Sequence, residues 1–425
     1  MYILPKYSTI RILINKRVVS IVQYISLKKI YYSKRAEYEN EYHKRMNDMA
    51  CVSLGLNGGQ GEMFFVYTPE MVSLLSKVLT VNSKIEVLYK SLPRAARDCY
   101  SRNCLIDEIM MTNDIEGVRS TRKEILDVIE APDDKKNKHS RFEGLIQKYL
   151  RLLESDAGDI PLNSCKDIRN LYDEIVLPEI DDCNKPDGEI FRKGSACVIS
   201  ATQQEKHKGV VPEAKIVEYM SKAIEILNSE QLPLLVRIAV VHYLIGYIHP
   251  FYDGNGRLSR FISSYMLQKD LNPLIALRLA YAIKNDKSQY YKAFDLCNDV
   301  KNRGDVTPFI LMFLEMLEHA AASIFTRLDE GMEVLYYYNG LVGKIKNADE
   351  RNVIFFLIQN KLFASERFDI QNIANLLDCS YGKAKKILEG LIKEGVPIKR
   401  KKPSRKYLFS VDLNDISDYL EKYQD

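Results

Sequence analysis

A short stretch, His249–Arg260 (HPFYDGNGRLSR), concentrates the side chains of this chain that are best suited to chemistry. Apolar residues recur at helical spacing before it, in Pro233–Ile248, and again after it. The stretch is therefore predicted to be a tight loop that leads into the N-terminus of a helix. Free N–H groups and the positive end of the helix dipole meet at such a point, and anions bind there.

The charged residues of the stretch indicate which anion. Arg257 and Arg260 are three positions apart, so they share one face of the first helical turn. Cations are unfavourable at that end of a helix, and a bound phosphate would offset their repulsion. Gly254 and Gly256 would let the backbone approach the phosphate closely. Asp253 beside it could hold Mg²⁺, which takes one or two carboxylates plus phosphate oxygens.

His249 adds a base to this anion site. Its imidazole titrates near neutral pH and can take a proton from a hydroxyl group. The alternative is a polar turn with surface arginines. We prefer a nucleotide site because the base, the carboxylate, the glycines and the arginines all occur together within one short stretch.

The stretch resembles the signature of the Fic (filamentation-induced-by-cAMP) family, HxFx(D/E)GNGRxxR, and fills every fixed position. Members mostly transfer AMP from ATP to a protein hydroxyl and release pyrophosphate. The resemblance thus implies a protein adenylyltransferase that uses ATP and Mg²⁺ on a Ser, Thr or Tyr hydroxyl of a target protein or of itself. A family variant transfers phosphocholine, which stays an alternative. The implied roles are a general base (His249), a Mg²⁺ ligand (Asp253), a core anchor (Phe251) and phosphate contacts (Gly254, Asn255, Gly256, Arg257 and Arg260), with Arg260 at the γ-phosphate.

Residues 188–200 (GEIFRKGSACVIS) alternate apolar and polar side chains between turn residues, which predicts a short hairpin. It resembles the family's flap, which holds the target segment by strand addition. An ordinary surface hairpin is the alternative. The flap residues would be Gly188, Arg192, Val198, Ile199 and Ser200.

The segment SQYYKAFDLCN resembles the part of the family that lines the adenine pocket. The resemblance implies adenine contacts from Tyr290, Tyr291 and Asn298. By itself a Tyr-Tyr pair is more often core packing.

An inhibitory element is predicted before the signature. Thr112 and Glu116 are four apart on a predicted helix that Gly117 ends. They resemble the family's inhibitory motif, (S/T)xxxE(G/N), which implies that Glu116 pairs with Arg260 and blocks the γ-phosphate. A carboxylate at an arginine site mimics phosphate charge. The pattern recurs at residues 326–331, but only the first copy has flanking sequence (IEGVRST) that also resembles the family.

Composition sets outer limits on the class of protein. The 425 residues are 46% hydrophobic, which is typical of globular domains, and the net charge of +4 does not by itself imply nucleic acid. The eight cysteines lack CxxC spacing, so we expect reduced thiols and a cytoplasmic protein. We also expect no membrane-spanning run and no membrane partner. A homodimer is one candidate assembly, and the oligomeric state stays open.

The expected fold is mainly α: a Fic-type helical bundle with a β-hairpin flap, followed by a C-terminal winged helix-turn-helix domain. The basic stretch at the N-terminus could be a strand pair, a basic arm or an upstream start. The predicted divisions are a basic extension (1–47), an N-terminal helical region with the inhibitory helix (48–150), the catalytic core (151–328), a linker helix (329–349) and the winged-helix domain (350–425).

The last quarter of the chain offers a second hypothesis. A helix, a helix–turn–helix pattern around Asp378–Ser380 and a basic strand pair resemble a winged helix, a fold that often binds DNA. The alternative function is thus a DNA-binding transcriptional regulator that uses the Fic core as a nucleotide sensor. Winged helices also dock proteins. The predicted DNA contacts are Lys383, Lys386, Lys399, Arg400 and Lys402.

Overall fold

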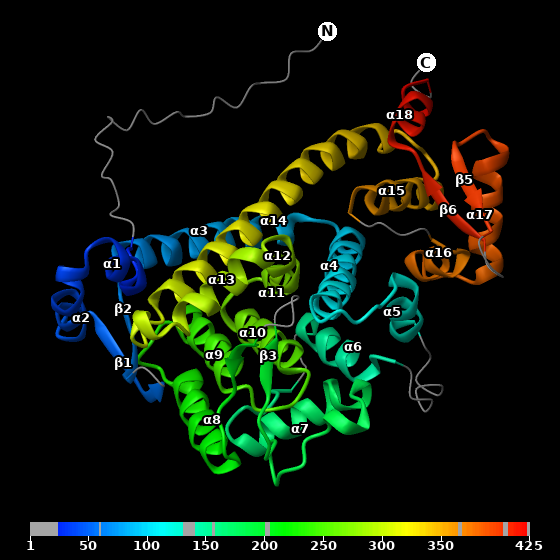
Figure 1. The fold of residues 1–425 in the computed structure, drawn as a ribbon. Coiled ribbons are helices and arrows are strands. Elements are labelled where there is room, and N and C mark those ends of the chain that lie inside the picture. Colours follow the sequence, from blue (N-terminus) through cyan, green and yellow to red (C-terminus); the bar gives the residue numbers. More distant parts are fainter. Residues whose placement is uncertain are drawn as a thin grey trace, which may run out of the picture.

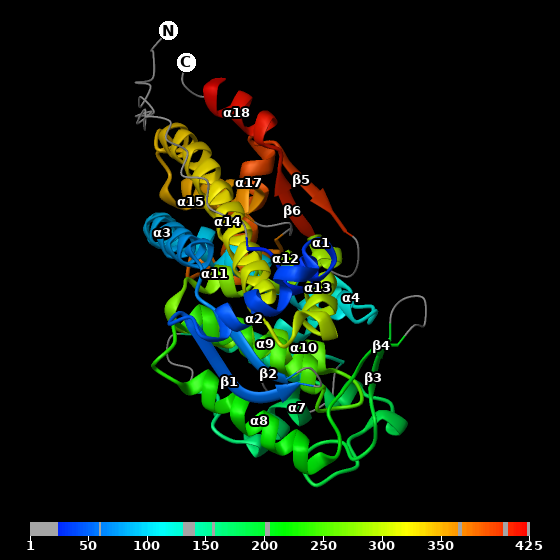
Figure 2. The same ribbon diagram turned by 60° about the vertical axis from the view of Figure 1, so that its left-hand side comes forward.

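The computed structural model describes residues 24–58, 61–130, 141–154, 158–199, 205–363, 368–402 and 407–422. Within these ranges the chain is mainly helical, and its strands form three separate two-stranded antiparallel sheets (Figures 1 and 2). The predicted mainly α fold class is therefore confirmed. Ser200, one of the predicted flap residues, lies outside the described residues.

The described N-terminal residues pack onto the helical body. The helix α2 (Tyr38–Met46) and Tyr24, which precedes α1 (Leu27–Ser33), are tied to it at the buried carboxylate of Asp305. Tyr24 Oη donates to Asp305 Oδ2 at 2.5 Å, and Arg45 Nη1 donates to the same oxygen at 3.0 Å. Residues 24–46 thus form a docked helical pair, which is neither the strand pair nor the basic arm considered for this extension.

A strand pair follows where helices were predicted. β1 (Cys51–Gly58) pairs with β2 (Gly61–Val66), so the prediction of a helical region from residue 48 is wrong at its start. Two apolar runs separated by glycines favour a hairpin over a helix. The helical part begins at α3 (Pro69–Ser91), whose N-cap Thr68 accepts a hydrogen bond from Met71 N at 3.0 Å.

The centre of the fold is a pair of consecutive helices, α9 (Leu234–Ile248) and α10 (Asn255–Asp270). Nearly every side chain of α9 is buried, and α10 packs along it. α4 (Arg94–Ile115) lies against α10 and ends beside the α10 N-terminus. Helices of the surrounding layer are α5 (Arg122–Ile129), α6 (Glu143–Leu150), α7 (Cys165–Ile175), α8 (Glu213–Asn228), α11 (Pro273–Ala276), α12 (Leu279–Asn285) and α13 (Lys287–Cys297).

One long helix, α14 (Thr307–Val342), joins the central body to the C-terminal part. It is continuous, so the predicted boundary between a core that ends at 328 and a separate linker helix falls inside it. Its buried residues extend on both sides of that point, from Phe309 to Val342, and one continuous face therefore packs along its whole length.

α14 also corrects the expectation that no run could span a membrane. By length and composition it could, with a mean hydropathy of 1.5 over its most apolar window. More than half of that window, 56%, is buried inside the protein. The mostly buried core helix of a soluble protein passes the same test of length and composition. One such helix is therefore weak evidence for a membrane span.

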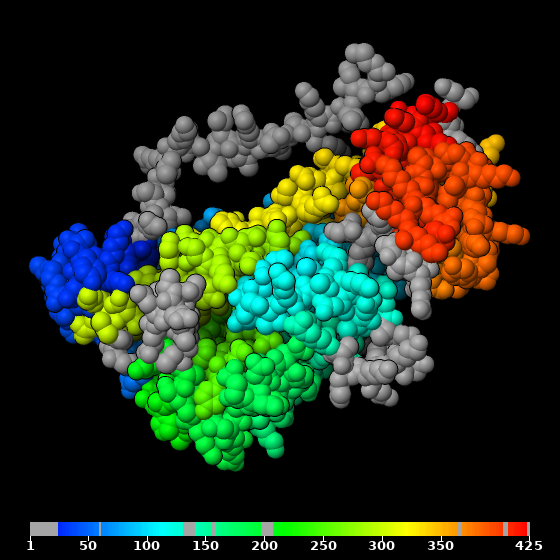
Figure 3. All heavy atoms as spheres, turned by 45° about the vertical axis from the view of Figure 1, so that its right-hand side comes forward, coloured from blue at the N-terminus to red at the C-terminus, as the bar shows by residue number. Residues whose placement is uncertain are grey.

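The C-terminal residues form a lobe at one end of the molecule (orange to red in Figure 3). α15 (Ala348–Phe363) packs on α4, α14 and α17, and the Phe368–Phe409 bridge ties the lobe internally. The lobe's other elements are α16 (Ile370–Leu376), α17 (Tyr381–Lys393), β5 (Ile398–Lys401), β6 (Leu408–Val411) and α18 (Leu413–Lys422). The order of helix, helix–turn–helix and strand pair is as predicted, whereas the winged-helix class stays a prediction.

Candidate active site

The loop between α9 and α10 is held in an unusual conformation. His249 ends α9 with φ 53°, and Gly254 leads into α10 with φ 80°. A left-handed histidine persists only where its surroundings enforce it, and such residues cluster at functional sites. Asn255 enforces it in part, because its Oδ1 accepts from Phe251 N at 3.0 Å and its Nδ2 donates to Phe251 O at 2.8 Å. Phe251 is fully buried and stacks on Tyr172, with 3.6 Å between ring centroids.

This geometry changes the role predicted for Asn255. Both ends of its side-chain amide are used to close the loop, so only its backbone N–H is left for a phosphate. The first N–H groups of α10, those of Asn255, Gly256 and Arg257, have no acceptor within the helix. The sequence predicts Asn255 only as a phosphate ligand, and its second role as a clamp of the loop is visible in the two bonds to Phe251.

Arg257 is the clearest sign of an anion site. Its side chain is 1% exposed, yet its Nε and Nη1 have no hydrogen-bond partner among the described residues. Buried donors without a partner are costly, and a cation at a helix N-terminus adds repulsion. An anion bound at the start of α10 would satisfy both the side chain and the helix end.

Arg260 already has an anionic partner. Its Nη2 donates to Glu116 Oε1 at 2.7 Å, and its Nε donates to Thr112 Oγ1 at 2.7 Å. The backbone carbonyl of Thr112 accepts a further bond from Nη2 at 3.0 Å. Arg260 is 1% exposed and Glu116 25%. The last turn of α4 thus lies directly on the second arginine, and Gly117 follows it with φ 74°.

Glu116 carries a full negative charge at this contact. Burial alone would favour the neutral acid, but Arg260, followed by Arg257 and Lys287, holds the pKa of Glu116 below its ordinary value. The pKa of Arg260 is raised despite its burial, chiefly by Glu116. Gly256 makes room for the contact, since a Cβ there would collide with Glu116 Oε1.

A cavity of about 690 Å³ lies in front of these groups, large enough for a nucleotide. It brings together residues from three predicted segments and from the strand β4 (Glu205–Lys208). The lining includes Glu116 and Gly117 of the inhibitory motif, His249, Asn255, Gly256 and Arg260 of the signature, His207 of β4, and Lys287, Tyr290, Tyr291 and Asn298 around α13.

The predicted adenine residues all line this cavity but present different surfaces. Tyr290 is buried, and its hydroxyl bonds His242 Nε2 at 2.7 Å, so it offers its ring. Tyr291 is 39% exposed and free to stack on a base. Asn298 Oδ1 accepts from Tyr243 Oη at 2.8 Å, which fixes its amide. The hydrogen bond to His242 explains why the Tyr290 hydroxyl can be buried in the protein interior.

His249 is suited to accept a proton. Burial, followed by the charge of Arg192 and of His207, lowers its pKa from 6.5 to about 4. The imidazole is therefore neutral at pH 7 and has a lone pair available for a hydroxyl proton.

We expect the His249 imidazole signal of the free protein to stay unchanged as the pH falls from neutrality to about 5.5. A histidine of ordinary pKa would be mostly protonated by then, whereas the folded-state pKa of His249 lies lower. Nuclear magnetic resonance of histidine-labelled protein, with His249→Ala to assign the signal, gives the titration. A midpoint near 6.5 would contradict the lowered pKa of His249.

Arg192 is a buried clamp under His249. Its Nε donates to His249 O at 2.8 Å and its Nη2 to Val210 O at 3.0 Å, and its Nη1 also donates to Gly194 O. The guanidinium thus ties the catalytic loop to the segments on both sides of the hairpin. The sequence predicts Arg192 only as a flap residue, whereas the burial of its side chain reveals this clamping role.

The hairpin lies further along the chain than predicted. β3 (Cys197–Ile199) pairs with β4, whereas residues 188–196 form bends, so the prediction that the hairpin begins at Gly188 is wrong. Glu213 Oε1 accepts from Ile190 N at 2.8 Å and from Phe191 N at 2.9 Å, which holds that segment in a loop. Val198 and Ile199 lie on β3, and Val210, just after β4, donates its N–H to Ile248 O at the end of α9 at 3.0 Å.

Asp253 lies at the mouth of the loop and is exposed. Its Oδ1 accepts from Gly254 N at 2.5 Å, which leaves its second carboxylate oxygen toward solvent. Among the described residues, no group of three or more His, Cys, Asp or Glu side chains could hold a metal ion. A single carboxylate does fit Mg²⁺ that is held mainly by substrate phosphates.

The predicted DNA contacts are exposed but partly engaged within the lobe. Lys383 Nζ pairs with Asp349 at 2.8 Å, and Lys399 Nζ pairs with Asp415 at 2.9 Å. Lys386 is exposed on α17, while Arg400 and Lys402 flank the ring of Tyr407. DNA contact stays a prediction.

The fold and the site together define a class of protein. It is a helical domain whose central loop places a histidine beside the N-terminus of a helix with two buried arginines. Residues 162–267 match the model of the Fic/DOC family, and this match contains α9, the loop and most of α10. The chain therefore contains a Fic/DOC family domain over residues 162–267.

Its relatives carry a consistent name. The chain is 29% identical over 247 residues to the "Protein adenylyltransferase Fic" of Drosophila grimshawi, covering 56% of this chain and 45% of the relative. It is 36% identical over 95 residues to the protein of the same name from Drosophila mojavensis, covering 22% of this chain and 17% of the relative. The chain thus spans less than half the length of these relatives.

Two solved structures are similar at low sequence identity. A Fic family protein from Desulfovibrio desulfuricans aligns with a TM-score of 0.49 at 18% identity, covering 82% of this chain and 98% of the other. Fic-1 from C. elegans aligns with a TM-score of 0.42 at 20% identity, covering 62% of this chain and 73% of the other.

Proposed function

We propose that this chain is an autoinhibited protein adenylyltransferase, which transfers AMP from ATP to a protein hydroxyl. One observation carries the proposal: a neutral His249 lines the same cavity as the α10 N-terminus and Arg260, and Glu116 occupies Arg260. The shared name of the Drosophila relatives supports the reaction type.

The adenine base would stack at Tyr291 and the ring of Tyr290, with the phosphates running toward the start of α10. There the first N–H groups of the helix and the unpartnered nitrogens of Arg257 would bind phosphate oxygens. This holds the α-phosphorus in front of His249. Positioning and charge neutralisation supply most of the rate in such transfers.

His249 takes the proton from the acceptor hydroxyl while that oxygen attacks the α-phosphorus. The bond from the α-phosphorus to the bridging oxygen breaks, and pyrophosphate leaves with the bond's electron pair. The left-handed conformation of His249, clamped by Arg192 and Asn255, keeps the imidazole at the cavity. A Mg²⁺ ion held by Asp253 and phosphate oxygens would neutralise charge on the leaving pyrophosphate.

Glu116 acts as the brake in this proposal. In the free protein its carboxylate satisfies the guanidinium that we assign to the γ-phosphate. A bound ATP must displace Glu116 or bind with its phosphates misplaced, and either outcome slows transfer. The two anions compete because a guanidinium binds carboxylate and phosphate with the same donors.

Intact-mass spectrometry of the purified chain tests the reaction type. The chain is incubated with Mg²⁺ and, in separate samples, with each of the four ribonucleoside triphosphates. We expect ATP to add the mass of one or more AMP groups, and peptide mapping to place them on hydroxyl side chains. An adduct from another nucleotide, or an adduct of a group other than AMP, would contradict adenylyl transfer. The absence of any adduct in the Glu116→Gly variant would also contradict it.

A further inference from the structure

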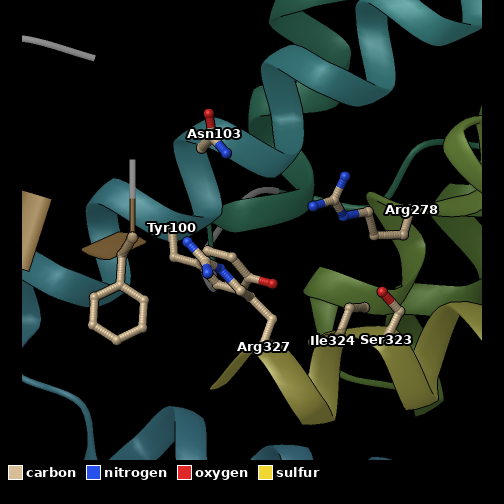
Figure 4. A pocket seen from close by; sticks show the side chains of 7 residues that line it. Tyr100, Asn103, Arg278, Ser323, Ile324 and Arg327 are labelled. Carbon is tan, nitrogen blue, oxygen red and sulfur yellow. The ribbon is translucent and has the colours of Figure 1, made fainter. Parts of the chain in front are cut away.

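A second cavity opens where α4 meets α14 and the C-terminal lobe. Its volume is about 180 Å³, and it shares no lining residue with the active-site cavity. Figure 4 shows the side chains that line it. The lining consists of Tyr100 and Asn103 of α4, Arg278, the α14 residues Ser323, Ile324 and Arg327, and Phe363 of α15.

The charges around this cavity are unbalanced. Arg278 and Arg327 both contribute to the lining, and Arg122 lies just behind Asn103, whose Oδ1 it binds at 3.0 Å. Asp107 is shared between two of these arginines, at 2.5 Å from Arg122 and 3.4 Å from Arg278. The lining itself contains no carboxylate. Two guanidinium groups thus line the cavity, and Asp107, the carboxylate that pairs with Arg278, lies outside it.

A buried hydroxyl adds a polar group. Tyr100 is 2% exposed, and among the described residues its Oη has no partner within full hydrogen-bond geometry, although the Arg278 guanidinium lies close enough to interact with it. In Figure 4 this hydroxyl and the Arg278 guanidinium point toward the same central space. The two groups are close enough that Arg278 partly offsets the effect of burial, which raises the pKa of Tyr100. Buried hydroxyls normally have a partner, so an unfilled one indicates a ligand position.

We propose that this cavity binds one phosphate-sized oxyanion, either inorganic phosphate or the phosphate of a phosphomonoester. Arg278 and Tyr100 would donate to it from the inner wall, and Arg327 and Ser323 would donate from the exposed rim. A guanidinium pair with a hydroxyl is a donor set for a tetrahedral oxyanion. A volume of 180 Å³ corresponds to roughly six water molecules. That volume suits one phosphate group with a few waters and is too small for a nucleotide.

The position of the site gives it a structural consequence. Tyr100 and Asn103 belong to α4, the helix whose last turn presents Thr112 and Glu116 to Arg260. Arg327 already donates to Leu362 O at 2.7 Å, which links α14 to the end of α15. A bound oxyanion would therefore join α4, α14 and the C-terminal lobe through one ligand.

Titration calorimetry of the full chain with inorganic phosphate, at constant ionic strength with chloride as the reference, tests the proposal. Because the start of α10 also attracts anions, the titrations use the Arg257→Gln background. We expect one saturable site, and Arg327→Gln should weaken its affinity about tenfold or more through the loss of a charge-assisted hydrogen bond. Lys361→Gln is the matched control, since it removes an exposed charge on α15 outside the cavity and should leave the affinity unchanged.

A second variant guards against a loss of folding. Ser323→Asp puts a carboxylate at the rim, so it should abolish phosphate binding and raise the unfolding temperature in the absence of phosphate. Absence of saturable binding would overturn the proposal. The proposal would also be overturned if Lys361→Gln weakened phosphate binding as much as Arg327→Gln does. The same holds if neither Arg327→Gln nor Ser323→Asp weakened phosphate binding.

Discussion

Replacing Glu116 with glycine is expected to raise the initial rate of AMP transfer about tenfold or more. Glu116 Oε1 lies 2.7 Å from Arg260 Nη2, inside the protein, and such charge-assisted hydrogen bonds contribute about 1.5–3 kcal/mol. Without the carboxylate, the guanidinium is available to the γ-phosphate from the outset. The rate is measured as label from ATP that enters the purified chain in the presence of Mg²⁺.

The second copy of the inhibitory pattern provides the control. Glu330 follows Thr326 by four residues, as Glu116 follows Thr112, but it is exposed in the middle of α14. Glu330→Ala should leave the transfer rate at the wild-type value, and alanine rather than glycine avoids weakening the helix. An unchanged rate in Glu116→Gly, or a similar rise in Glu330→Ala, would show that the Glu116 contact is not the brake.

Replacing His249 with alanine is expected to lower the transfer rate about 10²- to 10⁴-fold, the usual contribution of a positioned general base. The variant is best made in the Glu116→Gly background, where the starting rate is high. ATP affinity should change little, since we assign the phosphate contacts to the α10 N-terminus and the arginines. Single-turnover labelling gives the rate, and calorimetry gives the affinity.

His319→Ala is the matched control for this loss, because its side chain is 80% exposed and lies outside the cavity. It should transfer AMP at the rate of the parent. If His249→Ala kept more than about a tenth of the parent rate, a role as general base would be ruled out.

The local part of the site could be predicted from the sequence because one short segment contains it. His249, the two glycines and the two arginines lie on one loop and one helical turn, so residue types and spacing were enough. The Glu116–Arg260 contact is different, since 144 residues separate the partners. Spacing cannot pair residues that far apart, and only the resemblance to a family indicated it.

Other features depend on tertiary packing and were missed for that reason. Asn255 has the same sequence signal whether its amide binds phosphate or clamps the loop, and only the bonds to Phe251 distinguish the two roles. The sequence around Arg192 predicts a surface residue of a hairpin, yet the Arg192 side chain is buried beneath His249. The predicted boundary at 328 failed because the apolar face of α14 is continuous across it.

The central claim is that Glu116 and the γ-phosphate of ATP compete for Arg260. Titration calorimetry with ATP and with ADP tests it most directly, in a His249→Ala background that prevents turnover. Adding Glu116→Gly should tighten ATP binding about tenfold, whereas ADP, which has no γ-phosphate, should bind within about twofold of its former affinity. An equal gain for both nucleotides, or no gain for ATP, would contradict the account.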